Sequence, residues 1–204
     1  HQEVLNNIND GFLAKFNNNG VRQWGTYYGG TDYDYGYSVV TDLNNNVYLA
    51  GYTYSTNGIS TPGAHQVNFG GYIDAFLAKF NSNGVRQWGT YYGENGDDEG
   101  VSLAIDISGY IYLAGYTTSV NNISTTGAHQ ENIGGNFDGF LAKFNSNGVR
   151  QWGTYYGGSL VDDIRSVVTD ASGNIFFGGM TQSTNNISTP NAHQVNCSGT
   201  QDAY

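Results

Sequence analysis

Several residue types are scarce in this chain of 204 residues, which contains one cysteine, two prolines and seven lysines and arginines. The single cysteine, Cys197, excludes an internal disulfide and a cysteine-based metal cluster. Seven basic residues against 17 acidic ones give a net charge of −10. This argues against nucleic-acid binding, which needs clustered basic side chains to neutralise phosphates. No run approaches the ~20 apolar residues of a membrane span, so we expect no membrane insertion.

Glycine and tyrosine are abundant, with 30 and 17 copies, and the sequence around them repeats with a period of 64 residues. Trp24, Trp88 and Trp152 mark the period. The segment FLAKFNNNGVRQWGTYYG begins at Phe12 and returns at residues 76 and 140 with one change. Three periods fill 192 residues, and the remaining 12 restart the unit. A fixed period of this kind indicates a repeat architecture.

Each period contains four strand-like runs, which in the first copies are residues 12–16, 21–28, 37–42 and 47–53. The run 37–42 is rich in β-branched residues and apolar on both faces, which predicts a strand buried on both sides. No window of useful length carries the apolar stripe of an amphipathic helix. The sequence therefore predicts an all-β protein.

Four short strands in each unit predict a β-propeller in which every 64-residue repeat forms one four-stranded antiparallel blade. The period is longer than that of a usual blade, and the excess lies in the polar stretch 54–73. We expect one repeat domain over residues 1–204. Its parts are the outer strands of a split blade (1–30), two blades (31–94 and 95–158), and the inner strands of another split blade with the start of the next strand (159–204).

Within a blade, the doubly apolar strand 37–42 is expected to be innermost, followed by 47–53, 76–80 and 85–92 at the outer edge. Trp88 is expected to pack between adjacent blades. On that basis, replacing it with alanine would cost about 3–5 kcal/mol.

Three periods are too few for a closed propeller, which has four to eight blades. Two copies could form a six-bladed ring. However, residues 193–204 repeat residues 1–12, so the start of the third strand is present at both ends. The chain also starts at His1, with neither an initiator methionine nor a signal segment. We therefore expect a piece of a longer repeat protein.

Residues 74–119 contain a DAF strand, a tryptophan strand ending in Tyr-Tyr-Gly, an Asp-Asp turn, a strand ending in Asp106, and a final IYLAGYT strand. This order resembles the bacterial β-propeller repeat family called SBBP, and the similarity extends over all three periods. Gly93-Glu94 and the histidine at 65 depart from the family pattern. The resemblance implies a large secreted or cell-surface bacterial protein with a structural or adhesive role, and it supplies no active site.

Acidic turns before the inner strands suggest calcium ligands, because calcium takes six to eight oxygen ligands. Only one carboxylate position recurs in every period, and a single aspartate is what a turn needs to bind its own backbone N–H groups. We favour that role and expect no cofactor, with calcium as the alternative. The residues concerned are Asp34, Asp97, Asp98, Glu99 and Asp162.

Tyr28, Tyr92 and Tyr156 close the outer strands and could stack sugar rings, since tyrosine offers a flat apolar face with a polar edge. Aromatic residues are also favoured in strands for packing alone, which is the interpretation that we prefer.

No catalytic motif is present, so we expect the protein not to be an enzyme. The expected function is that of a structural or adhesive repeat module at the cell surface or outside the cell, acting through protein contacts or self-association of its repeats. The alternative is a multivalent carbohydrate-binding propeller, in which one weak site per blade is multiplied by avidity.

Overall fold

The computed structural model describes residues 9–197, 199 and 202–203, and their regular structure consists of strands in antiparallel sheets. The first sheet pairs β1 (Gly11–Phe16) with β2 (Arg22–Tyr28). The second contains β3 (Asp34–Thr41), β4 (Val47–Thr53), β5 (Asp74–Phe80) and β6 (Arg86–Tyr92). The third contains β7 (Asp98–Ile105), β8 (Ile111–Thr117), β9 (Asp138–Phe144) and β10 (Arg150–Tyr156). The fourth contains β11 (Asp162–Thr169), β12 (Ile175–Thr181) and β13 (Asp202–Ala203).

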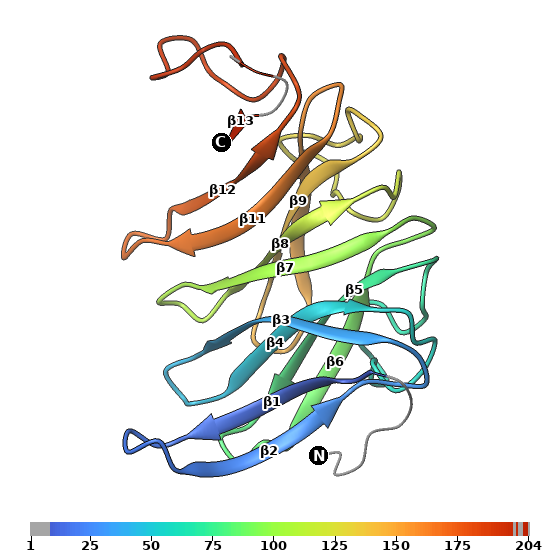
Figure 1. Ribbon diagram of the computed structural model, residues 1–204, viewed down its shortest axis with the longest axis vertical. Helices are drawn as coiled ribbons and strands as arrows, with labels where there is room; N and C mark the ends of the chain where they lie inside the picture. Colours follow the sequence, from blue (N-terminus) through green and yellow to red (C-terminus); the bar gives the residue numbers. More distant parts are fainter. Residues whose placement is uncertain (1–8, 198, 200–201, 204) are drawn as a thin grey trace.

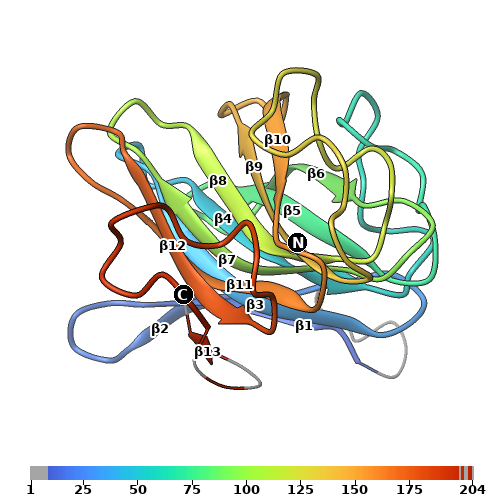
Figure 2. The ribbon, with the colours of Figure 1, turned by 90° about the horizontal axis from the view of Figure 1, so that it is seen from above.

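The sheets stack one after another, from β1 and β2 at one end to β11, β12 and β13 at the other (Figure 1). A view along the stack shows them superposed as successive blades (Figure 2). The two four-stranded sheets fall within residues 31–94 and 95–158 and have the strand order expected of blades. The all-β fold class and its four-stranded antiparallel blades are thus confirmed, and the described residues form an open array.

The first strands of the blades, β3, β7 and β11, lie next to one another. The backbone N–H of Leu103 donates to the Ser38 hydroxyl at 3.0 Å, and that of Val167 donates to the Ser102 hydroxyl at 3.1 Å. The blades therefore converge along these strands, while β6 and β10 form the opposite edges of their sheets. This is the order that the sequence predicted.

Burial of the inner strand on both faces holds for β7 alone. Leu103 and Ala104, on opposite faces of β7, are 5% and 6% exposed. The corresponding Val39 of β3 and Val168 of β11 are 54% and 56% exposed. The expectation was wrong for β3 and β11, because each has the inner strand of a neighbouring blade on only one side among the described residues; the first sheet contributes only its outer strands, β1 and β2.

Trp24 and Trp88 lie at the junctions between blades, as predicted for Trp88. The Trp24 Nε1 donates to the carbonyl of Ser82 at 3.0 Å, and the Trp88 Nε1 donates to that of Ser146 at 3.2 Å. Both acceptors belong to the hairpin turn of the following blade. On its own blade, Trp88 lies against Tyr48, with ring centroids 6.1 Å apart.

Replacing Trp88 with alanine is expected to lower the free energy of unfolding by about 2 kcal/mol, less than for a fully buried tryptophan, because part of the ring stays exposed. Urea denaturation of the chain measures the effect. Gln87→Ala, at the exposed neighbouring position, is the control and is expected to change stability by less than about 0.5 kcal/mol. Equal effects of the two substitutions would contradict the junction role of Trp88.

The long stretch between β4 and β5 explains the unusual period, because it runs along the free edge of the outer strand. The backbone N–H of Thr61 donates to the Gly89 carbonyl at 2.9 Å, and that of Tyr91 donates to the Gln66 carbonyl at 3.2 Å. The next blade repeats both bonds, at Thr125 and Tyr155. The extra residues thus satisfy an edge strand that would otherwise be open to pairing with another chain.

Candidate interaction surface

The tyrosines for which sugar stacking was the alternative interpretation pack at the junctions between blades. Tyr28 and Tyr92 are buried, and their hydroxyls donate to the carbonyls of Ile59 at 2.8 Å and Ile123 at 2.6 Å. Tyr156 is half-buried and makes the equivalent bond to Ile187 at 2.7 Å. The sugar-stacking alternative is therefore wrong for Tyr28 and Tyr92, because the following blade covers the ring faces that a sugar would use.

The surroundings of Tyr92 show how tightly this junction is packed. Its ring centroid lies 5.2 Å from that of Phe140 and 5.8 Å from that of Phe144, both on β9 of the following blade. The Arg150 guanidinium lies over the ring at 6.0 Å and donates to the Asn122 carbonyl at 2.6 Å. Burial raises the pKa of Tyr92 well above its ordinary value, against the opposing effect of Arg150, so the phenol stays protonated and donates its hydrogen bond.

The recurring aspartate of the acidic turns is a buried hydrogen-bond acceptor. Asp98 accepts hydrogen bonds from the Thr117 hydroxyl, from the Ser119 hydroxyl at 2.7 Å and from the Glu94 backbone N–H at 2.9 Å. Burial raises the pKa of Asp98, and these donors partly offset the shift. Asp34 and Asp162 occupy the same position in their blades, each bonded to a threonine and a serine hydroxyl.

Asp97 and Glu99 flank Asp98 in the chain, and alternation along a strand directs them away from the face that Asp98 occupies. The Glu99 carboxylate accepts a hydrogen bond from the Tyr116 hydroxyl. Over the described part of the chain, no three histidine, cysteine or acidic residues come together as metal ligands. The turn-forming role is supported for Asp34, Asp98 and Asp162, each of which accepts a hydrogen bond from a backbone N–H of the turn that precedes it.

A cluster of tyrosines that the sequence reasoning did not identify lies on the inner strands of the first complete blade. Antiparallel pairing sets Tyr35 opposite Tyr52, with ring centroids 4.8 Å apart. Tyr37 stacks on Tyr52 at 5.5 Å, and Tyr54 lies 5.9 Å from Tyr72. We call this cluster the tyrosine face, and its members are Tyr33, Tyr35, Tyr37, Tyr52, Tyr54 and Tyr72.

The tyrosine face is accessible at its two ends. Tyr37 and Tyr72 are 55% and 68% exposed, while the four rings between them are half-buried. Half-buried rings held against one another have little conformational freedom left to lose, so the face is preorganised for contact with another molecule.

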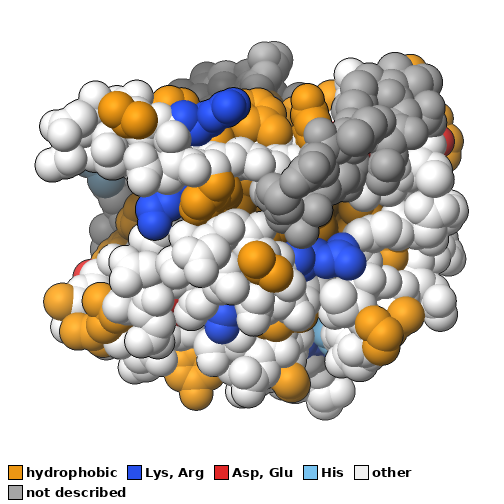
Figure 3. All heavy atoms as spheres, turned by 90° about the horizontal axis from the view of Figure 1, so that it is seen from below, with side chains coloured by type: hydrophobic (Ala, Val, Ile, Leu, Met, Phe, Trp, Pro, Cys, Tyr) orange, Lys and Arg blue, Asp and Glu red, His pale blue; other side chains and the backbone are white. Residues whose placement is uncertain are grey.

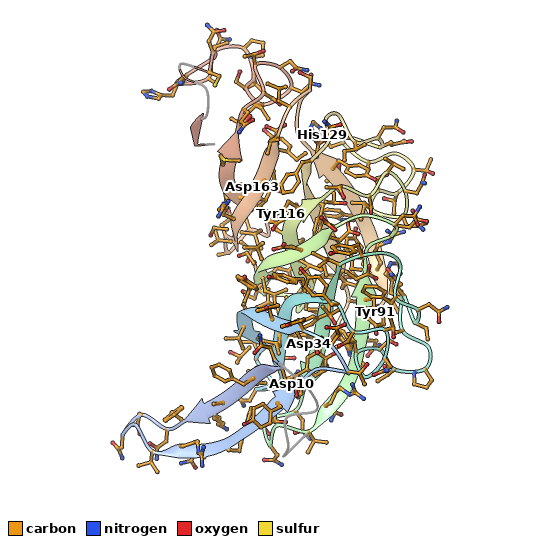
Figure 4. The ribbon with its side chains drawn as sticks, turned by 45° about the vertical axis from the view of Figure 1, so that its right-hand side comes forward. Asp10, Asp34, Tyr91, Tyr116, His129 and Asp163 are labelled. Carbon is orange, nitrogen blue, oxygen red and sulfur yellow. The ribbon has the colours of Figure 1, made fainter. Side chains whose placement is uncertain are left out.

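Acidic side chains continue this surface onto the following blades. Glu99 lies close enough to Tyr52 and Tyr54 to raise the pKa of both phenols, after the larger effect of burial. On the next blade, Arg165 forms an ion pair with Asp163 at 2.6 Å. Tyr116 and Asp163 lie on adjacent blades on the same side of the array, away from Tyr91 (Figure 4).

In the sequence, this surface is recognisable because its residues differ between repeats that are otherwise nearly identical. The outer strand RQWGTYY is identical in all three periods. In contrast, Tyr35 is replaced by Glu99 and Asp163, and Tyr37 is replaced by Val101 and Arg165. Positions 35 and 37 lie on the same face of the inner strand. Tyr37 and Arg165 are exposed there, whereas Asp163 is buried and paired with Arg165.

Comparison with known proteins agrees with this architecture. The profile of the SBBP family, described as a beta-propeller repeat, matches residues 23–59, 87–124 and 151–187, which together make up more than half of the chain. The chain belongs to the SBBP family. Each match runs from the tryptophan strand of one sheet through the first two strands of the next, and so spans a junction between blades.

This SBBP chain is also similar to an uncharacterized WD repeat-containing protein of Acanthamoeba polyphaga mimivirus. The two are 24% identical over an alignment that covers 76% of this chain and 13% of the relative. The chain thus corresponds to a small part of that protein. Among the described residues, no helix has the length and apolar character needed to cross a membrane.

Proposed function

We propose that this SBBP-repeat chain is a structural or adhesive module that binds a protein partner through the tyrosine face. Proteins built from β-propeller repeats commonly mediate protein interactions. The observation that carries the proposal is a preorganised cluster of six tyrosines with exposed ends on an otherwise repetitive surface. Tyrosine is enriched at the residues that dominate protein interfaces.

The charge around the tyrosine face indicates the chemistry of the partner. The chain carries a net charge of −10, and Asp32, Asp97 and Glu99 lie in or beside the turns that flank the face. The nearby Arg165 is already ion-paired with Asp163. We therefore propose that the partner presents lysine or arginine side chains, which would gain ion pairs with the carboxylates and cation–π contacts with the exposed rings.

The same proposal places the protein outside the cell or at the cell surface, on the strength of the SBBP family resemblance and the weakly charged, acidic composition. It includes no catalytic activity, because the sequence carries no catalytic motif. It also includes no cofactor, since the acidic residues of the turns accept internal hydrogen bonds instead of converging on a common point.

A glycan is the second candidate ligand, and the stacked rings of Tyr37 and Tyr52 favour it. Their planes are inclined by 26°, and the exposed edge of the pair resembles the aromatic platforms on which sugar rings stack. In this alternative, the sugar binds at the inner strands and not at the blade junctions, where Tyr28 and Tyr92 are buried.

Binding of the chain to arrays of lysine- and arginine-containing peptides and of neutral glycans distinguishes the two ligands. We expect peptide binding that weakens as salt is raised, and a loss of at least about tenfold in affinity with Tyr37→Ala combined with Tyr72→Ala. Tyr27→Ala removes an exposed tyrosine outside the face and serves as the control. Salt-independent glycan binding with the same mutational loss would support the alternative, and binding unaffected by the double variant would refute both.

A further inference from the structure

Four residues of the tyrosine face form a continuous path of ring contacts that begins at the protein surface. Tyr72, at the end of the long stretch between β4 and β5, is 68% exposed, and its ring centroid lies 5.9 Å from that of Tyr54. Tyr54 lies 6.2 Å from Tyr52, and Tyr52 lies 5.5 Å from Tyr37. Because aromatic rings in contact exchange electrons readily, an electron removed from Tyr72 can be replaced by one from the inner strands.

The path lies where two complete blades meet. The Tyr72 backbone N–H donates to the carbonyl of Gly96, in the turn before β7, at 3.4 Å. The carboxylates of Glu99 and Asp97 lie close enough to Tyr54 to raise its pKa, after the larger effects of burial and of Tyr72. The arrangement of the path is thus set by the sheets β3–β6 and β7–β10, both of which have four strands.

The path belongs to one blade and not to the repeat. In the second period, the positions of Tyr37, Tyr54 and Tyr72 are occupied by valine, threonine and asparagine. Tyr52 keeps a tyrosine equivalent, Tyr116. Because the second complete blade folds without the other three rings, packing of the repeat alone does not require them.

The last two rings of the path, those of Tyr37 and Tyr52, are arranged for coupling to each other. Tyr37 is the extra residue of a β-bulge, which places it beside Tyr52, and the two ring planes are inclined by 26°. Burial raises the pKa of Tyr52, and a hydrogen bond with the Tyr37 hydroxyl raises it further. Tyrosyl radicals combine at the carbons next to the hydroxyl-bearing carbon. A contact between the two hydroxyls therefore brings the reacting carbons together before any reaction.

We propose that the tyrosine face is a site of oxidative cross-linking, in which Tyr37 and Tyr52 join as dityrosine when a one-electron oxidant of the peroxidase class acts on Tyr72. The exposed ring gives up the electron, and the path of contacts transfers the oxidation to the pair on the inner strands.

The reaction consumes two equivalents of the oxidant. Each equivalent takes up one electron, and each oxidised phenol releases its proton to solvent, which leaves phenoxyl radicals on Tyr37 and Tyr52. The two radicals form one carbon–carbon bond between the carbons next to their hydroxyl-bearing carbons. The ring hydrogens at these carbons then move to the oxygens as the rings regain aromaticity, so the chain loses two hydrogens overall.

The cross-link ties β3 to β4 covalently through their side chains. It fixes two of the rings that we propose to contact a protein partner. The coupling needs no bound partner, so it does not rest on the proposed function, and its failure leaves the prediction of peptide binding unaffected.

Oxidation of the dilute 204-residue chain by a peroxidase with limiting hydrogen peroxide tests the proposal. Mass spectrometry of proteolytic fragments is expected to show Tyr37 joined to Tyr52 within one chain, with the loss of two hydrogens. Tyr37→Phe should abolish this link, because phenylalanine has no phenol to oxidise. Tyr72→Phe should lower its yield while Tyr37 and Tyr52 remain in place. Circular dichroism establishes that each variant is folded.

Two tyrosines outside the path are matched controls. Tyr116 is the equivalent of Tyr52 but has valine in place of Tyr37, so we expect it to form no such link. Tyr27 is 39% exposed on β2, at the end of the array that Figure 3 views, where hydrophobic side chains stand between lysine and arginine side chains. Tyr27→Phe is expected to leave the yield unchanged.

Three results would overturn the proposal. The first is a folded chain whose dityrosine forms at Tyr27 or Tyr116 as readily as between Tyr37 and Tyr52. The second is a yield that Tyr72→Phe does not change. The third is an equal yield of the link in the urea-unfolded chain, because the reaction would then not depend on the contacts of the folded blade.

Discussion

Replacing Tyr92 with alanine is expected to lower the free energy of unfolding by about 3–5 kcal/mol. The side chain is fully buried between two blades, packs against Phe140 and Phe144, and donates to the Ile123 carbonyl at 2.6 Å. Truncation removes the apolar burial and leaves a cavity at the junction. Chemical denaturation followed by tryptophan fluorescence measures the loss.

The repeats supply matched controls for this substitution. Tyr156 has the same local sequence but is half-buried, so Tyr156→Ala is expected to cost about half as much. Tyr92→Phe keeps the ring and removes only the hydroxyl, for an expected loss of about 1–2 kcal/mol. Equal losses for Tyr92→Ala and Tyr156→Ala would show that the blade junction is not what stabilises Tyr92.

The order of the strands could be predicted from the sequence because it depends on local patterns. Hairpin turns such as residues 17–20 connect neighbouring strands, and the β-branched run 37–42 indicated which strand is innermost, although its burial on both faces was overestimated. Because the sequence repeats every 64 residues, the same strand order is expected in each blade. The identity of the repeats also made the junctions regular, so Trp88 could be placed between blades.

The burial of both Tyr91 and Tyr92 could not be predicted from such local patterns. Alternation along a strand directs Tyr91 and Tyr92 to opposite faces of the sheet, so at most one of them was expected to be exposed on a given face. Both are buried, because blades cover the sheet from both sides and the Tyr91 hydroxyl donates to the Ser55 carbonyl of the long loop at 2.8 Å. That cover comes from residues far away in the sequence.

The tyrosine face was missed for a related reason. Tyr35 and Tyr52 become neighbours only through the register of β3 and β4, and Tyr72 joins them from the end of the long loop. A comparison of the three periods, position by position, would have found the site, since its residues, apart from Tyr52, change in the second period while the outer strands stay identical.

Asp74 is a buried carboxyl group whose ionisation should affect stability. One oxygen, Oδ2, accepts hydrogen bonds from the Gln66 side chain and the Gly70 backbone N–H, each at 2.8 Å. The other, Oδ1, is buried and has no hydrogen-bond partner among the described residues. Burial, followed by the neighbouring Asp98 carboxylate, raises the pKa of Asp74 from 3.8 to about 7.

Because the folded chain binds this proton more tightly than the unfolded chain, the favourable contribution of protonated Asp74 is present below pH 3.8. It is lost as the pH rises from 3.8 to about 7. A shift of this size corresponds to a few kcal/mol, since one pKa unit is worth about 1.4 kcal/mol. Urea denaturation across this range is expected to show stability falling as the pH rises, with a shallower slope in Asp74→Asn.

Asp42 is a control, because its pKa is shifted in the opposite direction from that of Asp74. Although partial burial tends to raise its pKa, hydrogen bonds from Asn46 and the Asn44 backbone lower it overall, so its contribution is lost as the pH falls. Asp42→Asn should therefore remove stability at neutral pH and less of it in acid, while Asp74→Asn has its most favourable effect relative to the parent chain at neutral pH. If Asp74→Asn leaves the pH profile unchanged, the buried carboxyl group ionises as it does in the unfolded chain, and the long loop must open to solvate it.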